Sequence, residues 1–187
     1  MDCDIMDSSN EIEQIKNRIV EQVAENMKSY GHAGTIGKVL AIIHYEDKPM
    51  NLDELSEKTG MSKTRMSQVL RQMSNLNIAE KTFVPGSRKD TYIVEQDYYQ
   101  TFLTLVVHNW NSLVDRNVHI EKRLLRDLSL IIDDECATEH EKQIAQKLYD
   151  DSKASLQYFD WIRRLALLFE SKDILKYVPI TEVENTE

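Results

Sequence analysis

The chain has 187 residues, of which 41% are hydrophobic and 29% charged, and its formal net charge is −9. This composition is typical of a globular protein that folds as one domain or as two small ones. The sequence has no apolar run of eighteen residues and no basic N-terminus followed by an apolar segment. We therefore expect no membrane contact and no secretory signal, and we expect the protein in the cytoplasm.

The residue types that carry catalysis or bind metals show no recognisable pattern. The two cysteines, Cys3 and Cys136, lie far apart without a CxxC motif, which argues against a disulfide framework or a zinc site. The five histidines form no HExxH motif, and neither GxSxG nor a phosphate-binding glycine loop is present. We predict a protein without enzymatic activity, cofactor or metal. An oxidation-sensing Cys136 is an alternative, although the neighbouring acidic residues 133–135 disfavour its thiolate.

The first predicted element is an amphipathic helix. Ser8 and Glu11 have the spacing of a capping box, and apolar side chains then recur at helical spacing over residues 12–30. A small globular domain would not need this helix. We interpret segment 1–34 as a dimerisation arm that packs on another helix or another subunit.

Three of the five glycines, Gly31, Gly34 and Gly37, follow this helix. Apolar residues with helical spacing begin again at Ile36 and indicate the first helix of a second domain, residues 35–97. A glycine cluster indicates either close approach to a ligand or neighbouring helix, or a loop. We interpret this one as a loop with a single tight helix contact.

Residues 51–76 are predicted to form two short helices joined by a tight turn. Asn51 and Glu54 have the spacing of a capping box for the first helix. Gly60 is the expected stop of that helix, because glycine adopts the left-handed conformation without steric cost, and Ser62 can cap the next one. The stretch therefore predicts a helix-turn-helix.

The second of these helices has an apolar face and a polar face. The apolar side chains recur at intervals of three and four residues: Met66, Val69, Leu70 and Met73. The side chains that we predict to contact DNA are Ser62, Lys63, Thr64, Arg65, Ser67, Gln68 and Arg71. Long cations and amides on an exposed helix can reach phosphates and base edges in a major groove. A helical hairpin with a solvated charged face is the alternative.

A β-hairpin is predicted directly after this helix. Residues 78–84 and 91–94 are rich in β-formers, and a Pro-Gly-Ser turn separates them. Arg88 and Lys89 lie near the tip, so the hairpin has the form of a wing that can place cations along the DNA backbone or in a minor groove. The pattern predicts a winged helix-turn-helix domain.

Positive charge is concentrated in this region. Residues 61–93 contain six Lys and Arg and two acidic residues, a local charge of 6 − 2 = +4, which leaves −9 − 4 = −13 for the rest of the chain. Such an asymmetry favours a polyanion at this surface and disfavours it elsewhere. The interpretation requires that Lys63, Arg65 and Arg88 share one surface and are not neutralised by the protein's own carboxylates.

Two long amphipathic helices are predicted in residues 98–187. An apolar stripe follows the acidic start at residues 95–97 and continues to Ile131, and the sequence leaves open whether residues 98–132 form one helix or two. Thr138 and Glu141 have capping-box spacing for the next long helix. The overall prediction is a mainly α fold with a small β-hairpin wing, and an acidic C-terminal segment that we expect to be loose.

A small winged domain cannot cover helices of this length. We therefore predict that they form a dimerisation domain in a homodimer. Two DNA-reading helices spaced one DNA turn apart would recognise an inverted repeat in double-stranded DNA.

The segment GMSKTRMSQVLRQMSNLNIAEKTFVPGSRKDTYIVEQDYYQTF resembles the winged helix of MarR-type bacterial repressors, and more narrowly their GbsR-type, choline-responsive branch. The similarity continues through SLQYFDWIRRLALLFESKDILKYVPI and covers most of residues 12–180. It implies a homodimeric repressor of glycine betaine synthesis or choline import genes whose DNA contact changes when a quaternary ammonium compound binds. The resemblance carries over Ser62, Lys63 and Ser67 as positions of the reading helix and Arg88, Lys89 and Asp90 as positions of the wing.

Aromatic residues give a separate indication of such a ligand. Ten of the fourteen lie between Tyr98 and Tyr177. A quaternary ammonium ion cannot donate an N–H hydrogen bond, so proteins hold it against aromatic faces. The predicted ligand-binding residues are Tyr98, Tyr99, Phe102 and Trp110, with Asp97 or Glu95 as an anionic partner; each aromatic side chain could instead belong to a core.

Two other functions fit parts of the pattern. A MarR-type regulator could sense a different small molecule or an oxidant. A winged helix can also serve as a protein-interaction module without nucleic acid. Charge distinguishes a DNA-binding domain from a protein-interaction module, because only the DNA-binding domain needs the local charge of +4 in residues 61–93.

Overall fold

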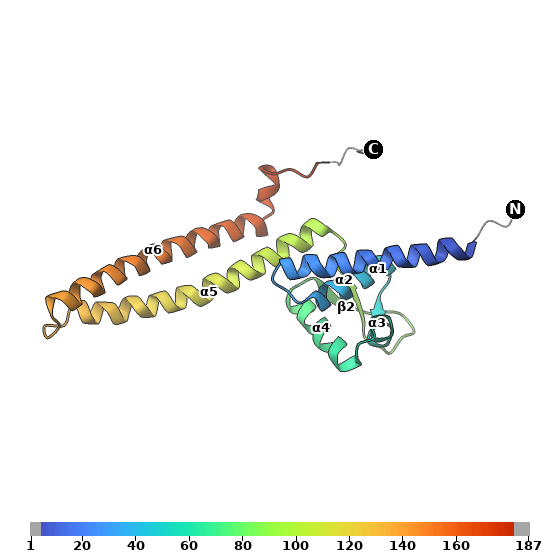
Figure 1. The fold of residues 1–187 in the computed structure, drawn as a ribbon, viewed down its shortest axis with the longest axis horizontal. Coiled ribbons are helices and arrows are strands. Elements are labelled where there is room, and N and C mark those ends of the chain that lie inside the picture. The colour runs from blue at the N-terminus through green and yellow to red at the C-terminus, as the bar shows by residue number, and fades with distance from the viewer. Residues whose placement is uncertain (1–4, 182–187) are drawn as a thin grey trace. The chain divides into compact units, whose positions relative to one another are not determined.

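The computed structural model describes residues 5–181 (Figure 1); Cys3 and most of the acidic C-terminal segment lie outside this range. Its elements are α1 (Ile5–Ser29), α2 (Gly34–Glu46), β1 (Met50–Asn51), α3 (Leu52–Thr59), α4 (Lys63–Asn75), β2 (Ala79–Thr82), β3 (Thr91–Val94), α5 (Tyr98–Ile132), α6 (Glu139–Glu170) and the 3-10 helix η1 (Asp173–Lys176). The mainly α fold with a small wing is therefore confirmed. The chain divides into two compact units, Met1–Leu105 and Val106–Glu187.

The helix-turn-helix forms as its local sequence predicts. The Asn51 side chain accepts hydrogen bonds from the backbone N–H groups of Asp53 and Glu54, and the Glu54 carboxylate accepts from the Asn51 N–H. Gly60 ends α3 with a φ of 69°, and the Ser62 hydroxyl accepts from the Arg65 N–H at the start of α4. These bonds pair backbone groups that a helix end leaves unsatisfied.

The sheet contains one strand more than the predicted hairpin. Strands β2 and β3 pair antiparallel, with Ala79 opposite Val94 and Thr82 opposite Thr91. The two residues of β1 pair with the other edge of β3, and the strand order is β1-β3-β2. Because β1 leads directly into α3, this pairing ties the start of the helix-turn-helix to the wing.

The core of the first unit lies under α4. Sixteen buried side chains form one cluster: Met27, Ile36, Val39, Leu40, Ile43, Met50, Leu55, Met66, Val69, Leu70, Met73, Leu76, Ile78, Ala79, Val94 and Leu105. The predicted apolar face of α4 is entirely within it. Since the same helix has its polar residues on the opposite side, burial of this face leaves the proposed DNA-contacting side chains toward solvent.

The predicted capping box at Ser8 and Glu11 is wrong. Helix α1 begins at Ile5, before Ser8. No glycine or proline lies between Ile5 and Ser8, so nothing in the sequence stops the helix from extending past the predicted cap. Towards its other end, α1 buries Ala24 and Met27 against α2.

The glycine segment was predicted as a loop, and this is only partly right. Gly31 has a φ of 85° and lies in the turn after α1, whereas Gly34 and Gly37 belong to α2. A β-carbon at Gly37 would lie 2.6 Å from the Val23 carbonyl oxygen and 2.7 Å from the Ala24 Cα. Gly37 therefore makes the predicted tight helix contact, from within a helix and against the backbone of α1.

The second unit is a helical hairpin. Helix α5 is one continuous helix of 35 residues, and the capping box of Thr138 and Glu141 that starts α6 is confirmed. Within the unit, Val114, Phe159 and Ile162 form a small buried cluster. Polar contacts also join the two helices: the Ser155 hydroxyl lies 2.7 Å from Glu121 Oε1, and an Arg163–Asp115 ion pair spans 2.6 Å.

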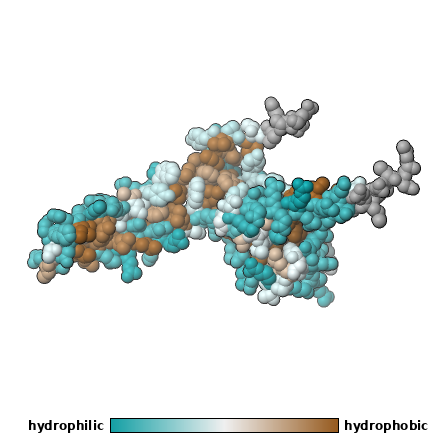
Figure 2. Space-filling view, in the orientation of Figure 1, coloured by the Kyte–Doolittle hydropathy of each residue, from teal (hydrophilic) through white to brown (hydrophobic). Residues whose placement is uncertain are grey.

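Much of the apolar surface of this hairpin is exposed. Figure 2 shows hydrophobic residues spread along both long helices. The exposed large side chains of the hairpin include Ile120, Leu124, Leu130, Ile131, Ile144, Leu148, Tyr158, Trp161 and Leu167. A groove of about 460 Å³ near the hairpin turn is lined by some of them, among them Ile131, Ile144 and Leu148.

Candidate nucleic-acid interface

The polar face of α4 carries the side chains predicted to contact DNA. Ser62, Lys63, Thr64, Arg65, Gln68 and Arg71 are exposed, and Ser67 is partly buried. On the wing, Arg88 and Lys89 are exposed as well. The structure thus leaves the predicted residues of the helix and the wing accessible to a partner.

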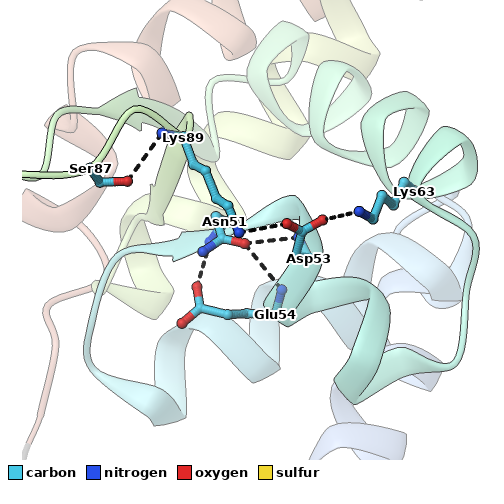
Figure 3. Close-up of polar contacts among 6 residues, drawn as sticks. All are labelled: Asn51, Asp53, Glu54, Lys63, Ser87 and Lys89. Carbon is cyan, nitrogen blue, oxygen red and sulfur yellow. Dashed lines mark hydrogen bonds and ion pairs between the residues drawn. The ribbon is translucent and has the colours of Figure 1, made fainter.

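Asp53 lies in the first turn of α3 and connects α4 to the wing (Figure 3). Its Oδ1 lies 2.5 Å from Lys63 Nζ, and its Oδ2 lies 2.7 Å from Lys89 Nζ. The two lysines lower the pKa of the Asp53 carboxyl to about 2, mainly through their hydrogen bonds. The carboxylate raises the pKa of Lys89 in turn, so both partners are charged near neutral pH.

The cations of the region divide into two groups. Lys63 and Lys89 pair with Asp53, and Lys81 pairs with Asp90 at 2.6 Å. Arg65, Arg71 and Arg88, by contrast, make no ion pair with any residue of the described range 5–181. The expectation that the cations escape neutralisation by the protein's own carboxylates is therefore wrong for the lysines and correct for the arginines.

Asp53 was missed by the sequence analysis, which counted charges along the chain. Asp53 is 10 residues from Lys63 and 36 from Lys89, so no helical or strand periodicity places them together. The pairing of β1 with β3 brings the start of α3 next to the wing, and only the folded chain shows this.

The predicted ligand-binding aromatics have different neighbours in the structure. The Tyr98 hydroxyl lies 2.7 Å from the Tyr45 hydroxyl and 3.1 Å from His44 Nε2. The Phe102 ring packs edge-on against Tyr30, with 5.6 Å between centroids. Tyr98, Tyr99 and Phe102 are 53%, 50% and 39% exposed, so part of each side chain is accessible to solvent.

Trp110 has a packed environment in the second unit. Its ring lies 5.2 Å from that of Phe169, and it packs against the cluster around Val114. This arrangement indicates a core role.

The two carboxylates proposed as anionic partners accept backbone hydrogen bonds at the start of α5. Asp97 Oδ1 accepts hydrogen bonds from the backbone N–H groups of Tyr99 and Gln100, and Glu95 accepts from the Asp97 N–H.

Burial and the hydrogen bond to Tyr45 raise the pKa of Tyr98 to about 12, so its hydroxyl remains protonated at neutral pH.

Metal ligation and membrane insertion have no support in the described part of the chain. Among residues 5–181, no group of three or more His, Cys, Asp and Glu side chains could hold a metal ion. Within the same range, no helix is long and apolar enough to cross a membrane. Cys136 is an exposed free thiol.

Comparison with known proteins connects both units to transcription factors. Residues 98–176 match the family described as GbsR family transcriptional regulator, C-terminal helical hairpin. The HTH-type transcriptional repressor GbsR of Bacillus subtilis (strain 168) is 33% identical over 90% of this chain and 93% of its own length. The chain belongs to the GbsR family of transcriptional regulators. The HTH-type transcriptional repressor OpcR of the same organism is 47% identical over 91% of this chain and 92% of its own.

Other relatives agree with membership of the GbsR family. YvaV of Bacillus subtilis (strain 168), also named as an HTH-type protein, is 51% identical over 90% of this chain and 94% of its own. A solved structure titled as a transcriptional regulator shares the fold, with a TM-score of 0.50 and 16% identity over 81% of this chain and 98% of that one. The three Bacillus subtilis relatives are named as transcriptional regulators or repressors, so the prediction that the chain is not an enzyme is confirmed.

Proposed function

We propose that this GbsR-family regulator is a repressor that binds double-stranded DNA through the polar face of α4 and through the wing. The observation that carries this proposal is that Arg65, Arg71 and Arg88 are exposed and make no ion pair within residues 5–181. An exposed guanidinium without a carboxylate partner is available for phosphate oxygens or the guanine edge. Thr64, Ser67 and Gln68 on the same helix add shorter polar contacts.

Arg65 on α4 and Arg88 on the wing provide the test. Arg65→Ala on α4 and Arg88→Ala on the wing should each weaken binding to the DNA upstream of this gene by about 5- to 160-fold, for a lost contact of about 1–3 kcal/mol. Gel shifts measure this, and circular dichroism checks that the variants fold. Arg126→Ala, an exposed arginine of α5 in the second unit, is the matched control. Unchanged shifts for Arg65→Ala and Arg88→Ala would support a protein-interaction module instead.

We further propose that the protein acts as a homodimer of the MarR type. The exposed apolar side chains along α5 and α6 support this, because water-exposed apolar surface of this extent usually marks an interaction site. Two copies would present two α4 helices to an inverted-repeat operator. Light scattering at micromolar concentration should give twice the chain mass, and a strictly monomeric species would contradict the dimer.

We also propose that a small quaternary ammonium compound such as choline or glycine betaine modulates DNA binding, linking the protein to osmolyte synthesis or uptake. Support comes from the accessible rings of Tyr98, Tyr99 and Phe102 at the start of α5. Each ring face is worth about 0.5–2 kcal/mol to a bound cation. The ligand can change DNA affinity only by its differential affinity for two arrangements of the protein.

Calorimetry with choline tests the ligand proposal. We expect heat of binding with the wild type and weaker binding with Tyr99→Ala, whose ring makes no contact with another aromatic ring in the described residues. Tyr177→Ala, an exposed tyrosine far along the chain, serves as the control. Absence of heat and of any change in operator affinity at millimolar choline and glycine betaine would leave a different effector, or an oxidant acting on Cys136, as the alternative.

A further inference from the structure

The carboxylate of Asp53 occupies the position between the two segments that the proposed function assigns to DNA. Lys63 is the first residue of α4, and Lys89 lies in the wing before β3. Each lysine Nζ contacts a different oxygen of the same carboxylate, at 2.5 and 2.7 Å (Figure 3). A single side chain thereby joins the reading helix to the wing.

Asp53 is itself held in place by the fold. Its backbone N–H donates to the Asn51 side chain at 2.8 Å, within the capping box of α3. Asn51 in turn pairs with Thr91 of β3. On the wing side, the Lys89 N–H donates to the Ser87 hydroxyl at 3.1 Å. The backbone segments on both sides of the Lys89–Asp53 contact are therefore positioned by hydrogen bonds.

We propose that Asp53 is a positioning residue for DNA recognition: it takes the place of a phosphate for Lys63 and Lys89 and, by holding both lysines, fixes the wing relative to α4. Carboxylates and phosphates both present anionic oxygens, and lysine binds either by a short charge-assisted hydrogen bond. The inference rests on the proposed DNA-binding function and adds a residue that does not itself contact DNA.

The contact has a consequence for specificity. Lysines that stay on Asp53 are not available to DNA phosphates. This loss applies to every DNA sequence, because phosphate contacts carry no sequence information. Asp53 therefore lowers the affinity for non-specific DNA, while the fixed wing preserves the geometry that an operator requires. The net effect is a higher ratio of operator affinity to non-specific affinity.

Asp53→Asn tests the proposal, because the amide keeps the shape of the side chain and removes its charge. Affinities for the upstream DNA and for a scrambled duplex are measured by fluorescence anisotropy between 50 and 200 mM salt. We expect affinity for the scrambled duplex to rise at least threefold, and the specificity ratio to fall. The slope of log affinity against log salt should steepen by up to about 1.8, since each freed lysine adds about 0.9.

Glu80→Gln is the matched control. Glu80 is an exposed residue of β2 that makes no ion pair within the described chain, so this variant removes one negative charge from the domain without freeing a lysine. Its salt slope should equal that of the wild type. Equal shifts for Asp53→Asn and Glu80→Gln, or an unchanged specificity ratio in Asp53→Asn, would overturn the proposal.

A double-mutant cycle gives a second measurement that does not depend on Asp53→Asn alone. Lys63→Ala and Lys89→Ala, singly and together, should be non-additive for DNA affinity when Asp53 is present and additive in the Asp53→Asn background. Additivity in both backgrounds would contradict the link. If the wild type binds no duplex in a salt-dependent way, the proposed function fails; if it binds and Asp53→Asn behaves like Glu80→Gln, only the role of Asp53 fails.

Discussion

The two units of the molecule differ in how completely they bury their apolar side chains. In Met1–Leu105, sixteen buried residues from five helices, the sheet and the adjoining loop form one cluster, whereas the buried cluster of Val106–Glu187 has three. Both units have amphipathic helices. In the first, most apolar side chains are covered by another element of the same chain, although Ile12 and Ile15 of α1 are exposed. In the second, most of the stripe of α5 and α6 is exposed. The first unit encloses a large apolar core, and the second exposes the apolar surface that supports the proposed dimer.

Removal of an apolar side chain should show this difference most strongly. Leu70→Ala, at a side chain that is 1% exposed, should lower the free energy of unfolding by about 2–5 kcal/mol, because it leaves a cavity in the main cluster. In the isolated subunit, Leu130→Ala, at 72% exposed, should change it by no more than about 0.5 kcal/mol. Chemical denaturation of both variants measures the contrast, and equal losses would show that the two units are alike.

The contact between α1 and α2 sharpens the comparison inside the first unit. Gly37→Ala places a β-carbon within 2.6–2.9 Å of α1 and should destabilise the protein by about 1–3 kcal/mol, despite the helix propensity of alanine. Gly34→Ala is the control, because its nearest neighbour is the flexible end of Lys28. Gly37→Ala should have a clearly lower melting temperature than Gly34→Ala. Similar melting temperatures for both would show that the close approach of α1 does not require glycine at position 37.

A charge on the exposed stripe of the second unit tests whether another copy covers it. Leu148→Glu should raise the dimer dissociation constant at least tenfold, about 1.4 kcal/mol, because a carboxylate would be buried in an apolar interface. Sedimentation at several concentrations measures this. Gln146→Glu, at an exposed polar residue of α6, is the control. An unchanged dimer dissociation constant in Leu148→Glu would show that Leu148 does not lie in the dimer interface.

The smallest expected effect is the pH dependence of the contact between Asp53 and the two lysines, Lys63 of α4 and Lys89 of the wing. The pKa of Asp53 is lowered from its usual 3.8 to about 2 by Lys63 and Lys89, so the contact is fully present above about pH 4 and is lost as the pH falls through about 2. Carboxyl NMR titration should show this low pKa, and Lys89→Ala should raise it towards 3.8. Lys81→Ala should leave it unchanged, because Lys81 pairs with Asp90.

Sequence predicted the features that depend on near neighbours in the chain. The capping boxes at Asn51 and Thr138, the stop at Gly60 and the buried face of α4 all follow from spacings of a few residues. The continuity of α5 was left open, because a long stripe without glycine or proline fits either one helix or two.

The features that sequence did not predict depend on residues far apart in the chain. Strand β1 has only two residues and is defined by its pairing with β3, forty residues later. Gly37 was assigned to a loop because the helix that approaches it was not known to lie there. Asp53 was missed for the same reason: a charge count along the chain does not show which carboxylate meets which lysine.

Salt dependence of DNA binding tests the central claim most directly. With three arginines per subunit that lack an ion pair within residues 5–181, binding to the upstream DNA should weaken steeply with salt. The slope of log affinity against log salt should be about −2.7 for one subunit and steeper for a dimer, at about 0.9 per phosphate contact. A slope near zero between 50 and 200 mM salt would contradict a cationic DNA-binding surface on α4 and the wing.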